Sequence, residues 1–129
     1  MATVADIMTR GLLSVASDAT LPAAAAEMTA RRVGAVVVLD GDAILGILTE
    51  RDVLRAVAEG GVDRSTVADW MTRHPETIEP SESTGTAATL MIHGGFRHLP
   101  VVDEGKVVGI VSIRDLMRVV LDDAAPRGV

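Results

Sequence analysis

Hydrophobic positions along the chain alternate between continuous aliphatic runs and helical spacing, and the alternation occurs twice. Aliphatic runs at 35–39 and 44–48, and again at 99–102 and 107–111, predict two pairs of strands. Short polar segments with glycine join each pair and predict hairpins: Asp40-Gly41-Asp42 and Asp103-Glu104-Gly105. Apolar residues at helical spacing then predict a closing helix after each hairpin, carrying Val53, Leu54 and Val57 in the first half and Leu116, Met117 and Val120 in the second.

The segments before these strands also match in kind. A short helical start at 4–8 or 67–71 is followed by a brief extended run at 13–15 or 77–78. A longer helix comes next. In the first half Asp18 or Thr20 is a candidate cap, Pro22 suits the first turn, and an alanine-rich stretch runs to Arg32. In the second half Gly94-Gly95 marks the helix end. The predicted order is β-α-β-β-α in each half, an α+β fold.

The two halves are copies of one unit. VADIMTR at 4–10 recurs as VADWMTR at 67–73, and the same shift of 63 residues aligns 4–59 with 67–122 without a gap. Seventeen of these 56 positions are identical, against a chance rate of roughly one in twelve to one in fifteen. We expect one repeat at 1–59, a linker at 60–66, a second repeat at 67–123 and a flexible tail at 124–129. Since one such unit cannot cover both faces of its sheet, we expect the repeats to pack sheet to sheet with helices outside.

Composition narrows the chemistry. Apolar residues make up 48% of the chain, but there is one Trp, one Phe and no Tyr, so the core is aliphatic. The absence of Cys removes disulfides and thiol nucleophiles. A net charge of −6 argues against a broad nucleic-acid surface, although a small phosphate pocket needs only a few basic groups. No segment has the length of a membrane span or the apolar core of a signal peptide, so a cytoplasmic protein is expected.

The start of each closing helix carries the candidate chemistry. Thr49 and Asp52 in the first repeat, and Ser112 and Asp115 in the second, have the spacing of a capping box, in which hydroxyl and acid satisfy the first backbone groups. The same geometry suits an anionic ligand, because a hydroxyl and outward N–H groups at a helix N-terminus can hold a phosphate. The two interpretations are compatible. His74, His93 and His98 lack the spacing of a metal site, so none is predicted.

The ordered motifs resemble the CBS (cystathionine-β-synthase-type) domain pair, also called a Bateman module. The resemblance spans essentially the whole chain and is carried by GILTERD at 46–52, GIVSIRD at 109–115, HLPVVD at 98–103 and the DIMT and DWMT starts. It implies regulatory binding of an adenosine-type ligand (AMP, ADP, ATP, NAD or S-adenosylmethionine) in clefts between the repeats. It also implies a homodimer and output to a separate, unknown effector protein, with no required cofactor.

The resemblance assigns site residues position by position. Asp52 and Asp115 would bind ribose beside Thr49 and Ser112, and basic residues near the start of the second repeat's first long strand would approach phosphates. From their strand positions, Gly46 and Gly109 lie where a side chain would block a ligand or an approaching backbone, and tight strand–helix packing is the alternative explanation. The remaining candidates are Arg97, His98 and Arg114, and, from the loops into the first strands, Thr9, Arg10, Thr72, Arg73, Pro75 and Thr77. Gly34 and Ala35 replace Arg97 and His98 in the first repeat, and Leu12 replaces Pro75, which fits the family's pattern. We therefore expect unequal clefts, with the one at Asp115 better equipped by Arg97, His98 and Pro75.

Two other functions compete with this interpretation. The chain could be a ligand-independent assembly protein that keeps the fold without the clefts. It could also be a small enzyme, but Ser, His and Asp occur with no arrangement that assigns nucleophile, base and orienting group.

Overall fold

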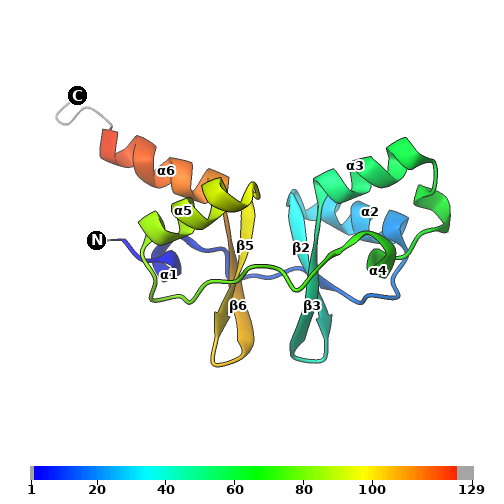
Figure 1. The fold of residues 1–129 in the computed structure, drawn as a ribbon, viewed down its shortest axis with the longest axis horizontal. Helices are drawn as coiled ribbons and strands as arrows, with labels where there is room; N and C mark the ends of the chain where they lie inside the picture. The colour runs from blue at the N-terminus through cyan, green and yellow to red at the C-terminus, as the bar shows by residue number, and fades with distance from the viewer. Residues whose placement is uncertain (1, 125–129) are drawn as a thin grey trace. The chain divides into compact units, whose positions relative to one another are not determined.

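The computed structural model describes residues 2–124 and confirms the α+β fold with two repeats of the same element order (Figure 1). The first repeat comprises α1 (Val4–Ile7), β1 (Ser14–Val15), α2 (Leu21–Arg31), β2 (Ala35–Asp40), β3 (Ala43–Thr49) and α3 (Glu50–Glu59). A 3₁₀ turn, η1 (Val62–Arg64), follows. The second repeat comprises α4 (Val67–Trp70), β4 (Thr72–Arg73), α5 (Thr84–Gly94), β5 (His98–Asp103), β6 (Lys106–Ser112) and α6 (Ile113–Ala124). The predicted tail, 124–129, lies outside the described residues except for its first position.

Local signals behave as the sequence predicts. Thr20 caps α2 by accepting a hydrogen bond from the Ala23 N–H at 3.2 Å, and Pro22 lies in the first turn. Helix α5 ends at Gly94, and its C-cap Gly95 has a φ of 71°, the left-handed conformation that glycine adopts without strain. Ile78 makes a parallel bridge to Val101, which matches the pairing of β1 with β2 in the first repeat.

The chain forms two compact units, and these do not coincide with the two sequence repeats. One unit contains Gly11–Pro75 with Gly105–Val107, and we call it the α3 unit. The other contains the described parts of 1–10, 76–104 and 108–129, and we call it the α6 unit. Helix α1 therefore belongs with the second repeat's strands and helices, and α4 belongs with those of the first. The short N-terminal helix of each repeat therefore lies in the unit that contains the longer helices of the other repeat.

Backbone hydrogen bonds hold the exchanged segments. In the α6 unit, Thr9 and Ile110 exchange a pair of bonds at 2.8 and 3.0 Å. In the α3 unit, residues 72–73 form strand β4 and pair antiparallel with Gly46 and Ile47 of β3. The sequence predicted a loop at 72–77, so β4 is a correction. A two-residue strand carries no periodic signal and forms only because β3 presents a partner.

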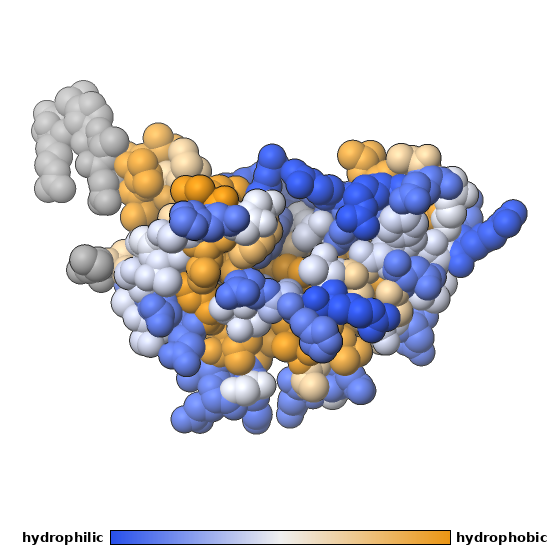
Figure 2. Space-filling view, in the orientation of Figure 1, coloured by the Kyte–Doolittle hydropathy of each residue, from blue (hydrophilic) through white to orange (hydrophobic). Residues whose placement is uncertain are grey.

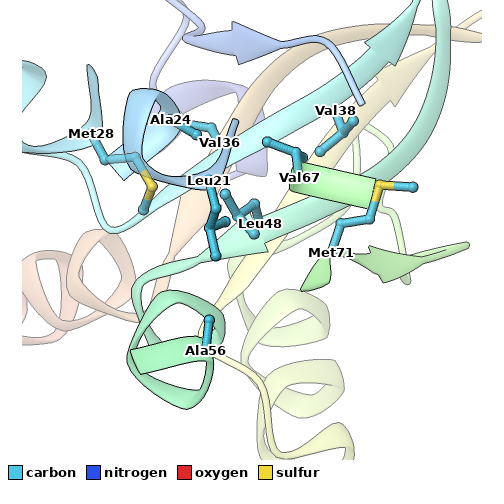
Figure 3. Close-up of a cluster of buried hydrophobic side chains, with 9 residues drawn as sticks. All are labelled: Leu21, Ala24, Met28, Val36, Val38, Leu48, Ala56, Val67 and Met71. Carbon is cyan, nitrogen blue, oxygen red and sulfur yellow. The ribbon is translucent and has the colours of Figure 1, made fainter. Parts of the chain in front are cut away.

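The exchanged helices also contribute to the cores. In the α3 unit the sheet order is β1-β2-β3-β4, and helices α2, α3 and α4 lie on one side of it (Figure 1). Figure 3 labels the side chains of this core, which include Val67 of α4 and Met71, the residue after α4. The cluster consists of Leu21, Ala24, Met28, Val36, Val38, Leu48, Ala56, Val67 and Met71. The α6 unit has a corresponding core of Val4, Ile78, Ala87, Met91, Leu99, Val101, Val111 and Leu116. Both cores are aliphatic, as the composition predicts.

Two glycines permit the exchange. A Cβ built on Gly46 would lie 2.5 Å from the Thr72 carbonyl oxygen and 3.0 Å from the Met71 sulfur. A Cβ on Gly109 would lie 2.9 Å from the Thr9 carbonyl oxygen and 2.7 Å from the Met8 sulfur. The carbonyl separations are shorter than side chains tolerate, and both carbonyls belong to segments fixed in backbone pairing. The close approach of another backbone segment is therefore a sufficient reason for glycine at both positions.

We predict that Val4→Ala destabilises the α6 unit and Val67→Ala the α3 unit, because each valine is fully buried in the core of the other repeat's strands. Each change should lower the local free energy of unfolding by about 1.5–3 kcal/mol. Amide hydrogen exchange reads this out: Val4→Ala should accelerate exchange in β5 and β6, and Val67→Ala in β2 and β3. Faster exchange in the strands of the mutated residue's own repeat would contradict the exchange of segments.

We further predict that Gly46→Ala lowers the free energy of unfolding by about 1–3 kcal/mol, because the methyl group would overlap the Thr72 carbonyl. Gly85→Ala is the matched control. Gly85 lies near the start of α5 with only the Ser83 hydroxyl within 4 Å, at 3.7 Å, so the control should be neutral or stabilising. Urea denaturation of the two variants and the parent measures the difference.

Candidate functional site

The start of α3 is a complete capping box. The Thr49 N–H donates to Oδ2 of Asp52 at 2.9 Å, and the Thr49 hydroxyl donates to the same oxygen at 3.1 Å. The Asp52 N–H in turn donates to the Thr49 hydroxyl oxygen at 3.3 Å. Asp52 is only 4% exposed, which is unusual for a carboxylate that no buried cation accompanies in the described contacts. The box therefore fixes both the rotamer and the burial of this side chain.

The start of α6 repeats the arrangement. The Ser112 N–H donates to Oδ2 of Asp115 at 2.8 Å, and the Asp115 N–H donates to the Ser112 hydroxyl oxygen at 3.1 Å. Asp115 is 9% exposed. The short helices α1 and α4 begin with the same box at Thr3–Asp6 and Thr66–Asp69, but there both acids are exposed. At Asp6 the backbone hydrogen bond from Thr3, followed by the Thr3 hydroxyl, lowers the pKa of the carboxyl. Burial thus distinguishes Asp52 and Asp115 from the other two.

The N-termini of α3 and α6 have fewer unbonded N–H groups for a phosphate than the sequence suggests. The first N–H of α3, on Glu50, donates to the Gly34 carbonyl at 2.9 Å, and the first N–H of α6, on Ile113, donates to the Arg97 carbonyl at 2.8 Å. The third N–H of each helix is held by the hydroxyl of Thr49 or Ser112. The expectation that these N–H groups point outward for a phosphate is wrong for these positions, because the chain itself satisfies them.

The second carboxylate oxygen of each acid lies outside the capping box and faces an arginine. Oδ1 of Asp52 lies 3.6 Å from a guanidinium nitrogen of Arg55, and Oδ1 of Asp115 lies 3.7 Å from one of Arg118. Both arginine side chains are mostly exposed, at 56% and 69%. An ion pair of this length with a solvated arginine is weak and displaceable. In the contacts described, Oδ1 of each acid is thus opposed only by a long ion pair with an exposed arginine, whereas Oδ2 is held by the capping box.

The sequence did not single out Arg55 or Arg118. Each follows its aspartate by three residues on the helix, and the two positions are equivalent in the repeats. That spacing is a detectable signal, since residues three apart on a helix are neighbours.

The segment exchange regroups the other predicted site residues. Thr9 and Arg10 join Gly109, Ser112 and Asp115 in the α6 unit. Thr72, Arg73 and Pro75 join Gly46, Thr49 and Asp52 in the α3 unit. We expected Pro75 to strengthen the same cleft as Arg97 and His98. The structure places it in the other unit, because β4 pairs with β3.

The basic candidates are peripheral or already engaged. Arg10 and Arg73 lie at equivalent positions, and each guanidinium donates to a carbonyl of the short helix before it, Ala5 at 3.4 Å and Ala68 at 3.5 Å. Arg97 and Arg114 are exposed, and His98 and Thr77 are half-buried. Arg97, His98, Thr77 and Arg114 all belong to the α6 unit. Arg97 and His98 thus lie in the unit of Asp115, whereas Arg114 has an equivalent in the α3 unit, Arg51.

Residues 2–124 contain no cluster of side chains that could hold a metal ion and no helix that could cross a membrane. Within that range no three His, Asp or Glu side chains gather at metal-binding separation. None of the helices described there combines the length and the apolar composition needed to cross a bilayer.

The comparisons with known proteins agree with this architecture. The CBS domain family model matches residues 4–59 and 67–122. The CBS domain-containing protein YhcV of Bacillus subtilis is 35% identical over 117 residues, covering 90% of this chain and 84% of YhcV. A putative signal-transduction protein with CBS domains from Burkholderia ambifaria has a structure with a TM-score of 0.90 at 35% identity, covering 99% of this chain and all of that one.

Two solved relatives contain ligands. The CBS domain pair of protein MJ0100, in complex with 5′-methylthioadenosine and S-adenosyl-L-methionine, has a TM-score of 0.90 at 26% identity and covers 95% of this chain and 98% of its own. The CBS domain protein PAE2072 of Pyrobaculum aerophilum, complexed with AMP, has a TM-score of 0.85 at 28% identity, with coverages of 95% and 98%. The family model matches both repeats, and the relatives share the fold over nearly the whole chain. This chain therefore belongs to the CBS domain family, as a tandem pair of CBS domains.

Proposed function

We propose that the chain is a regulatory module that binds an adenosine-type ligand at Asp52 and Asp115. The observation that carries the proposal is the state of these two carboxylates. Each is buried, oriented through Oδ2 by its capping box, and opposed at Oδ1 only by a long ion pair with an exposed arginine in the contacts described. A carboxylate held in this way is preorganised for a neutral donor, because its orientation is fixed before the ligand arrives.

The ligands of the relatives suggest which donor that is. AMP, 5′-methylthioadenosine and S-adenosylmethionine differ in charge at the 5′ position and share the adenine and the ribose. The ribose supplies two adjacent hydroxyls, and hydrogen bonds to a charged acceptor contribute roughly 1.5–3 kcal/mol each. Recognition of the ribose by Asp52 and Asp115 would thus suit every member of this class, including ADP, ATP and NAD.

The two sites should differ in strength. The α6 unit groups Arg97, His98 and Arg114 with Asp115, whereas the α3 unit has Gly34 and Ala35 in place of the first two. Cationic side chains near the ribose site favour a ligand with a 5′-phosphate. We therefore propose that AMP binds more tightly at Asp115 than at Asp52.

The proposed activity is regulation without catalysis. Both repeats contain the same box, and neither adds a nucleophile with its own base, which is the asymmetry that an active site needs. Binding in the cytoplasm would bias a separate effector protein. In the alternative, the chain keeps the fold for assembly alone and binds no nucleotide.

Asp115→Ala should weaken AMP binding at least tenfold, about 1.4 kcal/mol, and more than Asp52→Ala does. Isothermal titration of the full chain with AMP, ATP, NAD and S-adenosylmethionine measures this. The matched control is Asp6→Ala, which removes an equivalent capping box from the same unit at an exposed position. It should lose stability without losing affinity.

Three results would count against the proposal in different ways. Titrations without heat across the whole panel would favour the assembly function. Intact binding in Asp115→Ala with lost binding in Asp52→Ala would reverse the ranking of the sites. Equal losses in Asp6→Ala and Asp115→Ala would mean that the aspartate acts through helix stability alone.

We also propose that the chain forms a homodimer through the outer faces of α3 and α6. Leu54 and Val57 on α3 are exposed, and so are Met117 and Val120 at the equivalent positions of α6, with Leu121 beside them. Figure 2 shows apolar surface over both helices. A solvated helix rarely presents apolar side chains at three- and four-residue spacing in both copies of a repeat. A second copy of this chain offers the same apolar faces and so can cover them.

Val120→Glu with Leu121→Glu should convert the dimer to a monomer, because two carboxylates would be desolvated in an apolar interface. Sedimentation velocity should then give the mass of one chain instead of two. Asp42→Lys, in the exposed turn between β2 and β3, is the control and should remain dimeric. A parent chain that sediments as a monomer at all concentrations would refute the dimer.

A further inference from the structure

The arginine at the Asp52 site has a second partner. The guanidinium carbon of Arg55 lies 5.6 Å from the ring centroid of Trp70, within the range of a cation–π contact. The same guanidinium lies 3.6 Å from Oδ1 of Asp52. Arg55 thus contacts both the indole of Trp70 on α4 and the buried carboxylate of Asp52 on its own helix, α3, although its side chain is 56% exposed.

Trp70 is itself held in place. Its indole N–H donates to the Ser65 hydroxyl oxygen at 2.9 Å, and the Ser65 hydroxyl donates to the Gly61 carbonyl at 2.6 Å. Gly61 and Ser65 lie at either end of the turn that connects the repeats, where η1 forms. The indole therefore has a fixed orientation, and the position of Arg55 over it is defined by the fold and not by Arg55 alone.

The α6 unit lacks this arrangement among its described residues. Arg118 is equivalent to Arg55 and pairs with Asp115 at 3.7 Å, but Ile7 stands at the position of Trp70 and Ala2 at that of Ser65. Neither residue offers an aromatic face or a hydroxyl. Arg118 is also the more exposed of the two arginines, at 69%.

We infer that Trp70 is a positioning residue that holds Arg55 on Asp52, and that this clamp weakens ribose binding at Asp52 relative to Asp115. The inference deepens the proposed function and rests on it. A ribose hydroxyl that donates to Oδ1 of Asp52 must displace Arg55 from both the carboxylate and the indole. At Asp115 the hydroxyl displaces Arg118 from the carboxylate only. The inequality of the two sites then arises from the α3 unit's own side chains as well as from the basic groups of the α6 unit.

The clamp is testable without a ligand. The sequence contains one Trp and no Tyr, so tryptophan emission reports Trp70 alone. Arg55→Ala removes the side chain over the indole and should raise acrylamide quenching of that emission. Arg118→Ala is the matched control in the other repeat and should leave the quenching unchanged. Equal quenching in Arg55→Ala and the parent would show that Arg55 does not cover Trp70 in solution and would overturn the inference.

The effect on binding requires the Asp52 site in isolation. In an Asp115→Ala background, Trp70→Ile introduces the residue that the other repeat has, and it should tighten adenosine binding about three- to fivefold. Adenosine is the probe because it has no phosphate that Arg55 could bind. Trp70→Phe keeps an aromatic face and should bind as the background does. Unchanged or weaker adenosine binding in Trp70→Ile would refute the clamp.

A parallel titration with AMP separates the clamp from its main competitor. If Arg55 binds the ligand's phosphate, Arg55→Met will weaken AMP binding and leave adenosine binding unchanged, and the clamp is then wrong. If neither adenosine nor AMP binds the parent chain, the proposed function fails. In that event the inference about ligand affinity falls with it, whereas the quenching experiment still decides whether Trp70 holds Arg55.

Discussion

The close approach of two backbone segments at Gly46 and Gly109 is the constraint on which the structure depends. A single methyl group at either position would overlap a carbonyl of a segment that is fixed in strand pairing. Because both positions are glycine, the segments after α1 and α4 can lie against β6 and β3. Their helices then fill the cores of the opposite units with Val4, Val67 and Met71. Neither repeat can complete its unit without the other.

The same exchange determines which residues meet at each candidate site. A ligand at Asp52 would share a unit with the loop after α4, and one at Asp115 with the loop after α1. Trp70 reaches Arg55 for the same reason, since α4 packs in the unit of α3. The duplication thus produces two equivalent candidate sites, each sharing a unit with a segment of the other copy, and the side chains of the two copies differ.

The capping boxes place one motif in two different environments. At Asp6 and Asp69 the box starts a short helix, the acid is exposed, and it has no further role in the contacts described. At Asp52 and Asp115 the same hydrogen bonds hold a carboxylate that is buried, so the helix start also fixes the orientation of the group that we propose binds the ligand. A helix cap and a ligand site are both compatible with this geometry.

The elements, the duplication and the family are readable from the order of residues alone, because they depend on local signals: aliphatic runs, hairpin glycines, helix caps and motifs repeated at constant spacing. Thr49, Asp52, Ser112 and Asp115 could be identified in the same way, since a capping box is local. Three features emerge only from the folded chain: α1 and α4 exchange units, residues 72–73 form a strand, and Pro75 belongs to a different unit from Arg97 and His98. They arise from pairing between segments distant in the chain, and spacing along the sequence does not encode such pairing. The contact of Arg55 with Trp70 follows from the same long-range packing.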